Sequence, residues 1–183
     1  MLEQFIKNRI KQELPFVANE GQTELLDKLS HFITSTTPRK AFILRGYAGT
    51  GKTSIMAALV GALQQLQQRV ILLAPTGRAA KRMSELTGRE AQTIHRLLEV
   101  EWGANHRPVF MRNERNPLDC NVIIVDELSM VDIILFESLL SAMPRGCRLI
   151  MVGDSDQLPS VGAGNVLQDV IESGTVPVVE LTE

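Results

Sequence analysis

The sequence predicts an α/β fold in which a parallel sheet is covered by helices on both faces. Between its apolar runs, hydrophobic residues recur at the three- and four-residue spacing of amphipathic helices, as in 55–66 and 131–143. Strands that alternate with helices favour a parallel sheet with crossover connections. The apolar runs are short and nearly continuous, which is typical of buried parallel strands, and they occur at 41–44, 70–74, 122–125 and 149–152.

Two further helices are expected before the first strand. Apolar residues recur at helical spacing over 2–10 and over 25–33, and a proline follows each stretch. We therefore expect an N-terminal helical segment, residues 1–18, followed by a single α/β domain, residues 19–183. Residues 101–119 interrupt the pattern with Trp, Gly, Pro and Arg residues, and they predict an inserted loop or hairpin.

Charge and composition restrict the classes of protein. Hydrophobic residues make up 44% and charged residues 22% of 183, a balance that predicts a folded globular chain. The net charge of -2 excludes an overall basic surface, so any contact with nucleic acid must be local. Cys120 and Cys147 match no metal-ligand spacing and are expected to be reduced core residues, which suits a cytoplasmic protein. Charged residues interrupt every apolar stretch of 1–14, so we expect no signal peptide and no membrane association.

A glycine-rich segment, 46–53, directly follows the first expected strand. Two glycines with four residues between them, then a lysine and a hydroxyl residue, form the P-loop pattern that binds a nucleoside triphosphate such as ATP. Glycines let successive N–H groups surround phosphates, and a following helix adds its positive end. A glycine-rich turn with a solvated lysine is the alternative, which the strand before and the helix after disfavour. The residues expected to bind the nucleotide are Gly46, Ala48, Gly49, Thr50, Gly51, Lys52 and Thr53.

Polar side chains follow two other expected strands. Asp126 and Glu127 come directly after 122–125, at the carboxyl edge of the sheet, where ligands bind in this architecture. Asp126 can hold Mg²⁺ together with Thr53, and Glu127 can accept a proton from the water that attacks the terminal phosphate. An acidic pair at this position can also cap a helix. Gln157, after 149–152, is a candidate sensor of the terminal phosphate, although a Gly-Asp-Pro turn explains its surroundings equally well.

Basic residues follow the second expected strand. Thr76 can cap a helix whose first turns carry Arg78, Lys81 and Arg82, and a capped helix start with cations is a common contact for a nucleic acid backbone. A solvated helix face is the alternative interpretation. His95 extends the basic character, but a single histidine is more often an ordinary surface or core residue.

Taken together, these segments resemble the motifs of superfamily-one DNA helicases of the RecD and Dda branch, which includes the alpha subunit of exonuclease V. Residues 19–22 resemble the Q motif, 46–53 motif I, and 74–81 motif Ia. Three later segments are similar to motifs Ib, II and III, namely 93–98, 126–130 and 153–161. The resemblance covers nearly everything from residue 19 onwards, and it implies a RecA-like P-loop fold.

The resemblance also implies roles for individual residues. It implies that Gln22 reads the adenine, that Lys52 acts in catalysis with Glu127 and Gln157, and that Thr76, Arg78 and His95 lie on a track for single-stranded DNA. Leu128 stands where many relatives carry a small alanine, a departure that concerns packing more than chemistry.

The function implied is that of an ATP-dependent DNA helicase moving five-prime to three-prime, with roles in recombination and DNA repair. Residues 179–183 resemble the strand that opens motif IV, so we expect a second RecA-like domain in the parent chain to supply arginines to the site. Other recombination or repair subunits are further expected partners. On its own the chain is expected to bind ATP weakly and to hydrolyse it slowly. A nucleotide-dependent switch or loader acting on a protein partner is the alternative, and a small-molecule kinase is a third possibility without an evident lid.

Overall fold

One parallel sheet of six strands organises the molecule, as the alternating sequence pattern predicts. The computed structural model describes residues 1–36, 40–154 and 165–183. The strand order is β3-β2-β6-β7-β1-β8, with every neighbouring pair parallel. The strands are β1 (Ala41–Gly46), β2 (Val70–Ala74), β3 (Ala91–Thr93), β6 (Val122–Val125), β7 (Arg148–Asp154) and β8 (Val178–Leu181).

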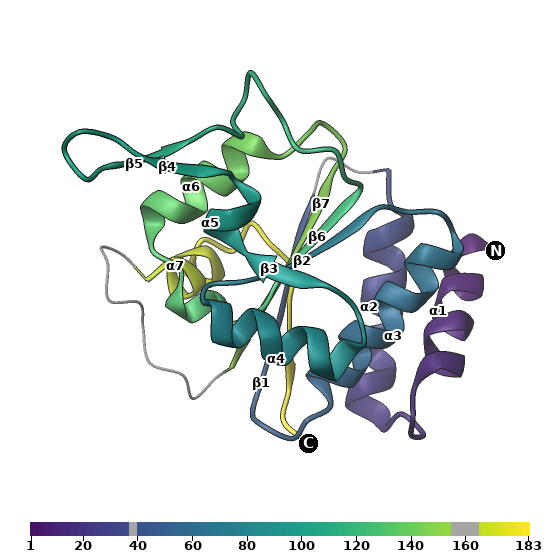
Figure 1. The fold of residues 1–183 in the computed structure, drawn as a ribbon. Helices are drawn as coiled ribbons and strands as arrows, with labels where there is room; N and C mark the ends of the chain where they lie inside the picture. Colours follow the sequence, from purple (N-terminus) through teal and green to yellow (C-terminus); the bar gives the residue numbers. More distant parts are fainter. Residues whose placement is uncertain (37–39, 155–164) are drawn as a thin grey trace.

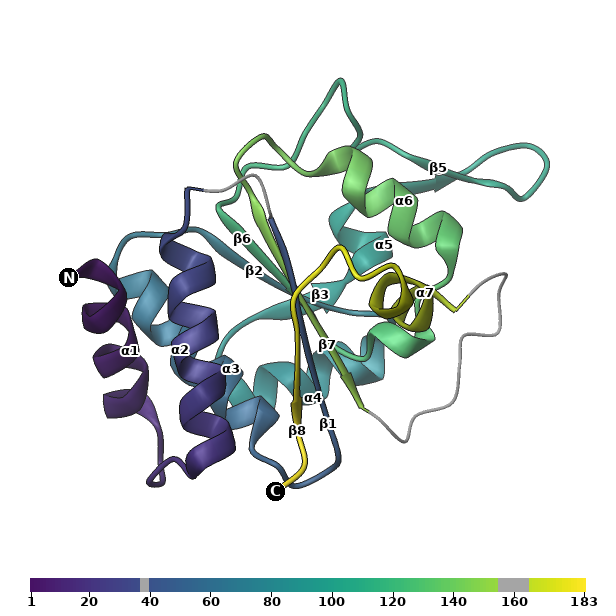
Figure 2. The same ribbon diagram turned by 180° about the vertical axis from the view of Figure 1, so that it is seen from behind.

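Helices cover both faces of this sheet (Figures 1 and 2). One hydrophobic cluster joins the sheet to α1, α2 and α3, and a second joins it to α5, α6 and α7. Alternate strand residues serve the two clusters: Ile124 faces the first, whereas Ile123 and Val125 face the second. The helices are α1 (Leu2–Glu13), α2 (Glu20–Thr34), α3 (Lys52–Gln65), α4 (Gly77–Thr87), α5 (Ile94–Leu97), the 3-10 turn η1 (Leu128–Met130), α6 (Ile133–Ala142) and α7 (Val166–Glu172).

The predicted fold class is confirmed, and the four predicted strands correspond to β1, β2, β6 and β7. The inserted segment forms an antiparallel hairpin of β4 (Val100–Trp102) and β5 (Pro108–Phe110) that projects from the body (Figure 1). The sequence did not predict β3, because its three residues are small or polar and form no apolar run. The terminal strand implied by the resemblance is present as β8, which pairs with β1.

The N-terminal helix α1 shares the hydrophobic core of the rest of the chain. Its apolar stripe buries Ile6 and Ile10 against α2 and α3. The cluster that contains these two residues extends to strand residues such as Leu44 and Ile150. Residues 1–18 thus pack on the sheet domain, while the boundary at residue 18 stays a prediction.

The two cysteines are buried and free, as expected. Cys120 and Cys147 precede neighbouring strands, and their Sγ atoms lie 3.7 Å apart. Within the described ranges, no helix is both long enough and apolar enough to cross a membrane.

The burial of α1 leads to a stability prediction. Ile10→Ala removes a fully buried side chain and should lower the free energy of unfolding by about 2–4 kcal/mol, because a cavity remains in the core. Chemical denaturation of the 183-residue chain measures this loss. The matched control is Leu2→Ala on the same helix, where the side chain is 57% exposed and the expected change is within about 0.5 kcal/mol. Equal effects of the two changes would show that α1 is not part of the core.

Candidate nucleotide-binding site

The glycine-rich loop after β1 has a backbone conformation that two glycines make possible. Gly49 and Gly51 have φ values of 80° and 85°, in the left-handed region that other residues rarely adopt. Gly51 is the N-cap of α3, so the helix begins at Lys52, as the P-loop pattern predicts. A Cβ atom on Gly51 would lie only 2.9 Å from Nε2 of Gln22. The loop is thus closely packed at the point where α3 directs its N-terminal N–H groups outwards, which is the geometry of an anion site.

Gln22 holds this loop against the start of α2. Its Nε2 donates to the carbonyl oxygen of Thr50 at 3.0 Å, and its side chain is buried. Its Oε1 accepts from the backbone N–H of Asn19 at 3.0 Å, while Asn19 Oδ1 accepts from the Gln22 N–H at 2.8 Å. This reciprocal capping box fixes the amide in place. Reading of adenine by Gln22 stays a prediction, and the structure adds an anchoring contact that the sequence did not indicate.

The Lys52 ammonium group lies across the mouth of the loop. Its Nζ donates to the carbonyl oxygens of Gly46 and Tyr47, at 2.6 and 2.7 Å. Thr50 Oγ1 donates to the same Tyr47 carbonyl at 2.8 Å, so the loop is closed by several hydrogen bonds. A lysine in this position supplies a cation directed at phosphates within the loop.

The predicted acidic pair lies at the carboxyl end of β6. Asp126 Oδ1 accepts from the backbone N–H of Glu127 at 2.8 Å, and the Asp126 N–H donates to Leu73 of β2. Glu127 itself has a φ of 53°, a strained conformation for a residue with a side chain, and such conformations cluster at functional sites. Asp154 ends β7 and pairs in register with Gly46, so a third carboxyl group stands between the acidic pair and the loop.

Burial raises the pKa of the Asp126 carboxyl above its ordinary value. The hydrogen bond from the Glu127 N–H and the positive charges of Lys52 and Arg82 oppose this rise, while the negative charge of Glu127 adds to it. An ionised Asp126 is therefore costly at this buried position, and a cation beside it would relieve the cost.

One cleft of about 480 Å³ brings together the P-loop and the carboxyl groups, whereas the predicted site residues Gln22, Gly46 and Thr50 do not line it. This volume is within the range that small-molecule sites commonly have. Thr53 and Asp126 both line the cleft, so an Mg²⁺ ion could take one ligand from each and complete its shell with phosphate oxygens and water. Over the described part of the chain, no group of three or more His, Cys, Asp or Glu side chains forms a separate metal site. The lining residues are Phe16, Ala48, Gly49, Gly51, Lys52, Thr53, Ser54, Met56, Ala79, Arg82, Met83, Leu86, Asp126, Glu127 and Asp154.

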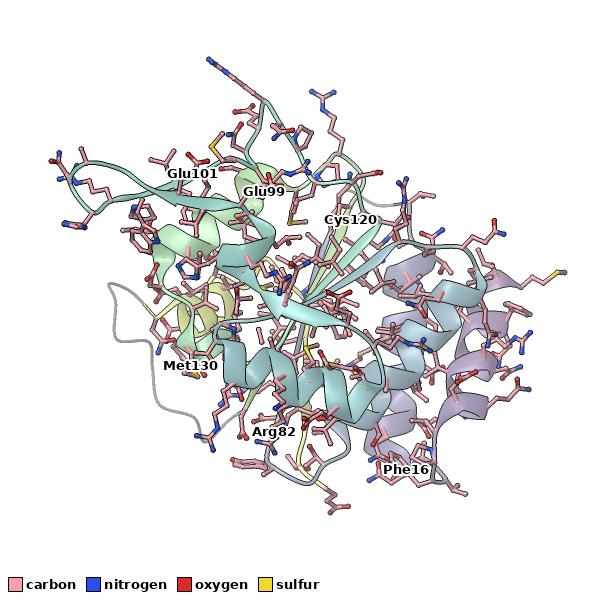
Figure 3. The ribbon with its side chains drawn as sticks, viewed as in Figure 1. Phe16, Arg82, Glu99, Glu101, Cys120 and Met130 are labelled. Carbon is pink, nitrogen blue, oxygen red and sulfur yellow. The ribbon has the colours of Figure 1, made fainter. Side chains whose placement is uncertain are left out.

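Sequence reasoning missed two residues that line this cleft, Arg82 and Phe16. Arg82 is an exposed residue of α4 that had been considered only for nucleic acid, and it shares a helix face with Ala79, Met83 and Leu86. Their spacing of three, four and seven residues was the signal that could have placed them together. Phe16, from the connection between α1 and α2, had no such signal. Figure 3 shows Arg82 and Phe16 along the same edge of the molecule.

The candidate DNA residues follow neighbouring strands. Thr76 comes after β2 and His95 after β3, and the ends of these strands pair through Ala74 and Thr93. The Thr76 hydroxyl accepts from the Ala79 N–H at 3.2 Å and caps α4, while Arg78 is exposed at its first turn. The His95 ring is half-buried beside Phe110, with 6.1 Å between ring centroids. Their contact with DNA stays a prediction. Gln157 lies outside the described residues.

The fold and the site together define a P-loop nucleotide-binding domain of the RecA-like class. The family model for the AAA domain matches residues 30–163, and the chain belongs to that family. Its relatives identify it further as a motor domain of the superfamily-one RecD and Dda type, which confirms the resemblance found in the sequence.

Three relatives illustrate this membership. The chain is 39% identical over 165 residues to the ATP-dependent RecD2 DNA helicase of Deinococcus radiodurans, covering 90% of this chain and 21% of that protein. It is 40% identical over 157 residues to the RecBCD enzyme subunit RecD of Mycobacterium tuberculosis, covering 73% of this chain and 27% of that subunit. For the ATP-dependent DNA helicase dda of phage T4 the identity is 39% over 124 residues, covering 66% of this chain and 28% of that protein. The chain thus spans about a fifth to a quarter of the length of these relatives.

Solved structures show the same fold. The Pif1 helicase from Candida albicans superposes with a TM-score of 0.61 at 23% identity, covering 93% of this chain and 40% of that one. Bacteroides Pif1 bound to single-stranded DNA gives a TM-score of 0.60 at 23% identity, covering 92% of this chain and 42% of that one.

The raised pKa of Asp126 leads to a prediction about stability and pH. Above that pKa the buried carboxylate is charged and destabilises the fold, so Asp126→Asn should raise the melting temperature at pH 8. As the pH falls through the raised pKa, the carboxyl becomes neutral and the advantage of the variant should shrink. Thermal melts from pH 4 to pH 8 in EDTA, which removes divalent cations, measure the difference. A variant less stable than wild type at pH 8 would contradict the burial effect.

Proposed function

We propose that this chain is the ATP-binding and ATP-hydrolysing motor domain of a DNA helicase. The intact protein would couple hydrolysis to movement along single-stranded DNA and to duplex unwinding, in the five-prime to three-prime direction that the family resemblance implies. The observation that carries the proposal is the single cleft that joins Lys52 of the P-loop to Asp126 and Glu127. The helicase names of the RecD2 and dda relatives support the DNA part.

In this proposal each residue of the cleft has one task. The loop N–H groups and Lys52 bind the phosphates of ATP, and Thr53 and Asp126 supply oxygen ligands for Mg²⁺. Bound Mg²⁺ would neutralise phosphate charge and orient the terminal phosphate for attack. The Glu127 carboxylate, which lines the cleft, accepts the proton of the attacking water. Gln157 would sense the terminal phosphate.

A second RecA-like domain of the parent chain would form the opposite wall of the cleft. Closure on ATP and reopening after hydrolysis would then alternate the grip of the two domains on DNA. The RecD relative is a subunit of the RecBCD enzyme, so further recombination subunits are possible partners of the intact protein.

Two substitutions separate nucleotide binding from hydrolysis. Lys52→Ala should abolish measurable ATP binding, because it removes the phosphate-directed cation from the loop. Glu127→Gln should leave binding near the wild-type value and lower kcat by roughly 10²- to 10⁴-fold, the usual contribution of a general base. Calorimetry and steady-state ATPase assays of the intact parent protein give both quantities. Full ATPase activity in Glu127→Gln would exclude Glu127 as the base.

The DNA track is tested in the intact parent protein by fluorescence anisotropy with a labelled single strand. The double change Arg78→Ala and His95→Ala should weaken binding and reduce its dependence on salt, because contacts with phosphates are lost. Wild-type affinity should differ between ADP and a non-hydrolysable ATP analogue. The matched control is Arg145→Ala, which removes an exposed arginine before β7, at the opposite edge of the sheet.

The same titration decides between the helicase and a nucleotide-dependent switch that acts on a protein partner. DNA affinity that changes with the bound nucleotide supports the helicase. If the wild-type parent bound no DNA at any salt concentration, the switch would be the better description.

A further inference from the structure

The position of Phe16 raises the question of how the cleft receives the base of a nucleotide. Phe16 lies between α1 and α2, outside the P-loop, and its side chain is 36% exposed. A Cβ atom on Gly51 would lie 3.1 Å from its ring atom Cζ and 3.8 Å from Cε1, so the tip of the ring lies next to the P-loop backbone. The ring also lines the cleft that contains Lys52 and Asp126.

The order of the strands shows which groups lie at each end of the cleft. In the sequence β6-β7-β1-β8, Asp126 and Glu127 follow β6, Asp154 ends β7, and the P-loop follows β1. Phe16 lies beyond the P-loop, on the side of α2, which contacts β8. The carboxyl groups thus occupy one end of the cleft and an aromatic ring the other.

This arrangement fixes how a nucleoside triphosphate can lie. The terminal phosphate belongs at the acidic end, where Asp126 can share a metal ion and Glu127 can act on a water molecule. The base must then point away from the carboxyl groups, past Ser54 at the start of α3, towards Phe16. A flat, partly exposed aromatic ring at this end of the cleft is suited to stacking against a base.

The Gln22 amide lies beside this ring. Its Nε2 and Phe16 Cζ approach the same point next to Gly51, at 2.9 and 3.1 Å. Gln22 already uses one amide N–H for Thr50 and one oxygen lone pair for Asn19. It keeps one donor and one acceptor position, which can bind a polar edge of a base, whereas Phe16 is positioned to contact the face of the base.

We propose that Phe16 is the base-contacting residue of this cleft, and that it binds the purine ring of ATP by stacking. The inference rests on the proposed ATPase function and extends it, because it gives residues preceding the P-loop domain a direct part in nucleotide affinity. Stacking is tolerant of base identity, so Phe16 contributes affinity for ATP and GTP alike and does not select between them.

The test compares ATP with inorganic tripolyphosphate, which has the phosphates and lacks the base. Calorimetry of the 183-residue chain with each ligand and Mg²⁺ gives four affinities for wild type and Phe16→Ala. Phe16→Ala should weaken ATP binding roughly tenfold, the order of one lost base stack, and leave tripolyphosphate binding within about twofold. GTP should lose affinity by a similar factor.

Two further variants control for folding and for loss of a ring in general. Phe5→Ala removes another partly exposed phenylalanine, 44% exposed on α1, and should leave both affinities unchanged. Phe16→Trp keeps a flat ring and should retain ATP binding even if Phe16→Ala folds poorly in a thermal melt.

The outcomes distinguish this inference from the proposed function. Equal losses for ATP and tripolyphosphate in Phe16→Ala would show that the ring only shapes the loop, and unchanged ATP affinity would show no contact with the base. Loss of ATP binding in both Phe16→Ala and Phe16→Trp, with tripolyphosphate binding also lost, would overturn it too. If the wild-type chain and the intact parent bound neither ligand, the ATPase proposal itself would fail.

Discussion

The hydrogen bond between Gln22 and Thr50 is the contact on which the geometry of the site depends. It joins the start of α2 to the P-loop across 28 residues of sequence, and it is buried. The loop includes two residues with positive φ, a conformation that costs backbone entropy to maintain. A fixed partner on α2 reduces this cost, because the capping box holds the Gln22 side chain in one position. The loop is consequently shaped before any ligand arrives, which is the condition for strong phosphate binding.

The parallel sheet brings the remaining groups to that loop. Strands β6, β7 and β1 are adjacent: Asp126 directly follows β6, Asp154 ends β7, and Gly46 ends β1 and begins the loop. Because all six strands run in one direction, these ends meet at one edge, although Asp126 lies more than 70 positions after Lys52 in the chain. Burial of the strands on both faces makes this register rigid. A one-residue slip of β6 would exchange Ile123 and Ile124 between the two cores and would also displace Asp126.

Sequence reasoning recovered the parts of this arrangement that depend on local patterns. The P-loop pattern located the start of α3 at Lys52, and the apolar runs located the strands that carry the acidic pair. It could not recover contacts that depend on packing between distant segments. Phe16 lies at the cleft in the connection between α1 and α2, two helices that pack on each other, and no periodicity in 14–18 indicates this. Likewise, the left-handed backbone of Glu127 occurs at the turn into η1, a conformation that its side-chain type did not indicate.

The balance of charged side chains in the cleft explains why binding and hydrolysis of ATP would require further cations. Within the described residues, two basic side chains, Lys52 and Arg82, share the cleft with three carboxyl groups. A triphosphate adds several negative charges, so direct binding of free ATP would place like charges together in a partly buried space. Mg²⁺ offsets part of this repulsion and also relieves the burial of the Asp126 carboxylate. Charge that develops on the terminal phosphate during transfer requires more positive charge at the acidic end. Arginines from a second domain would meet that need only when the cleft closes, which would make hydrolysis depend on closure and give a motor its coupling.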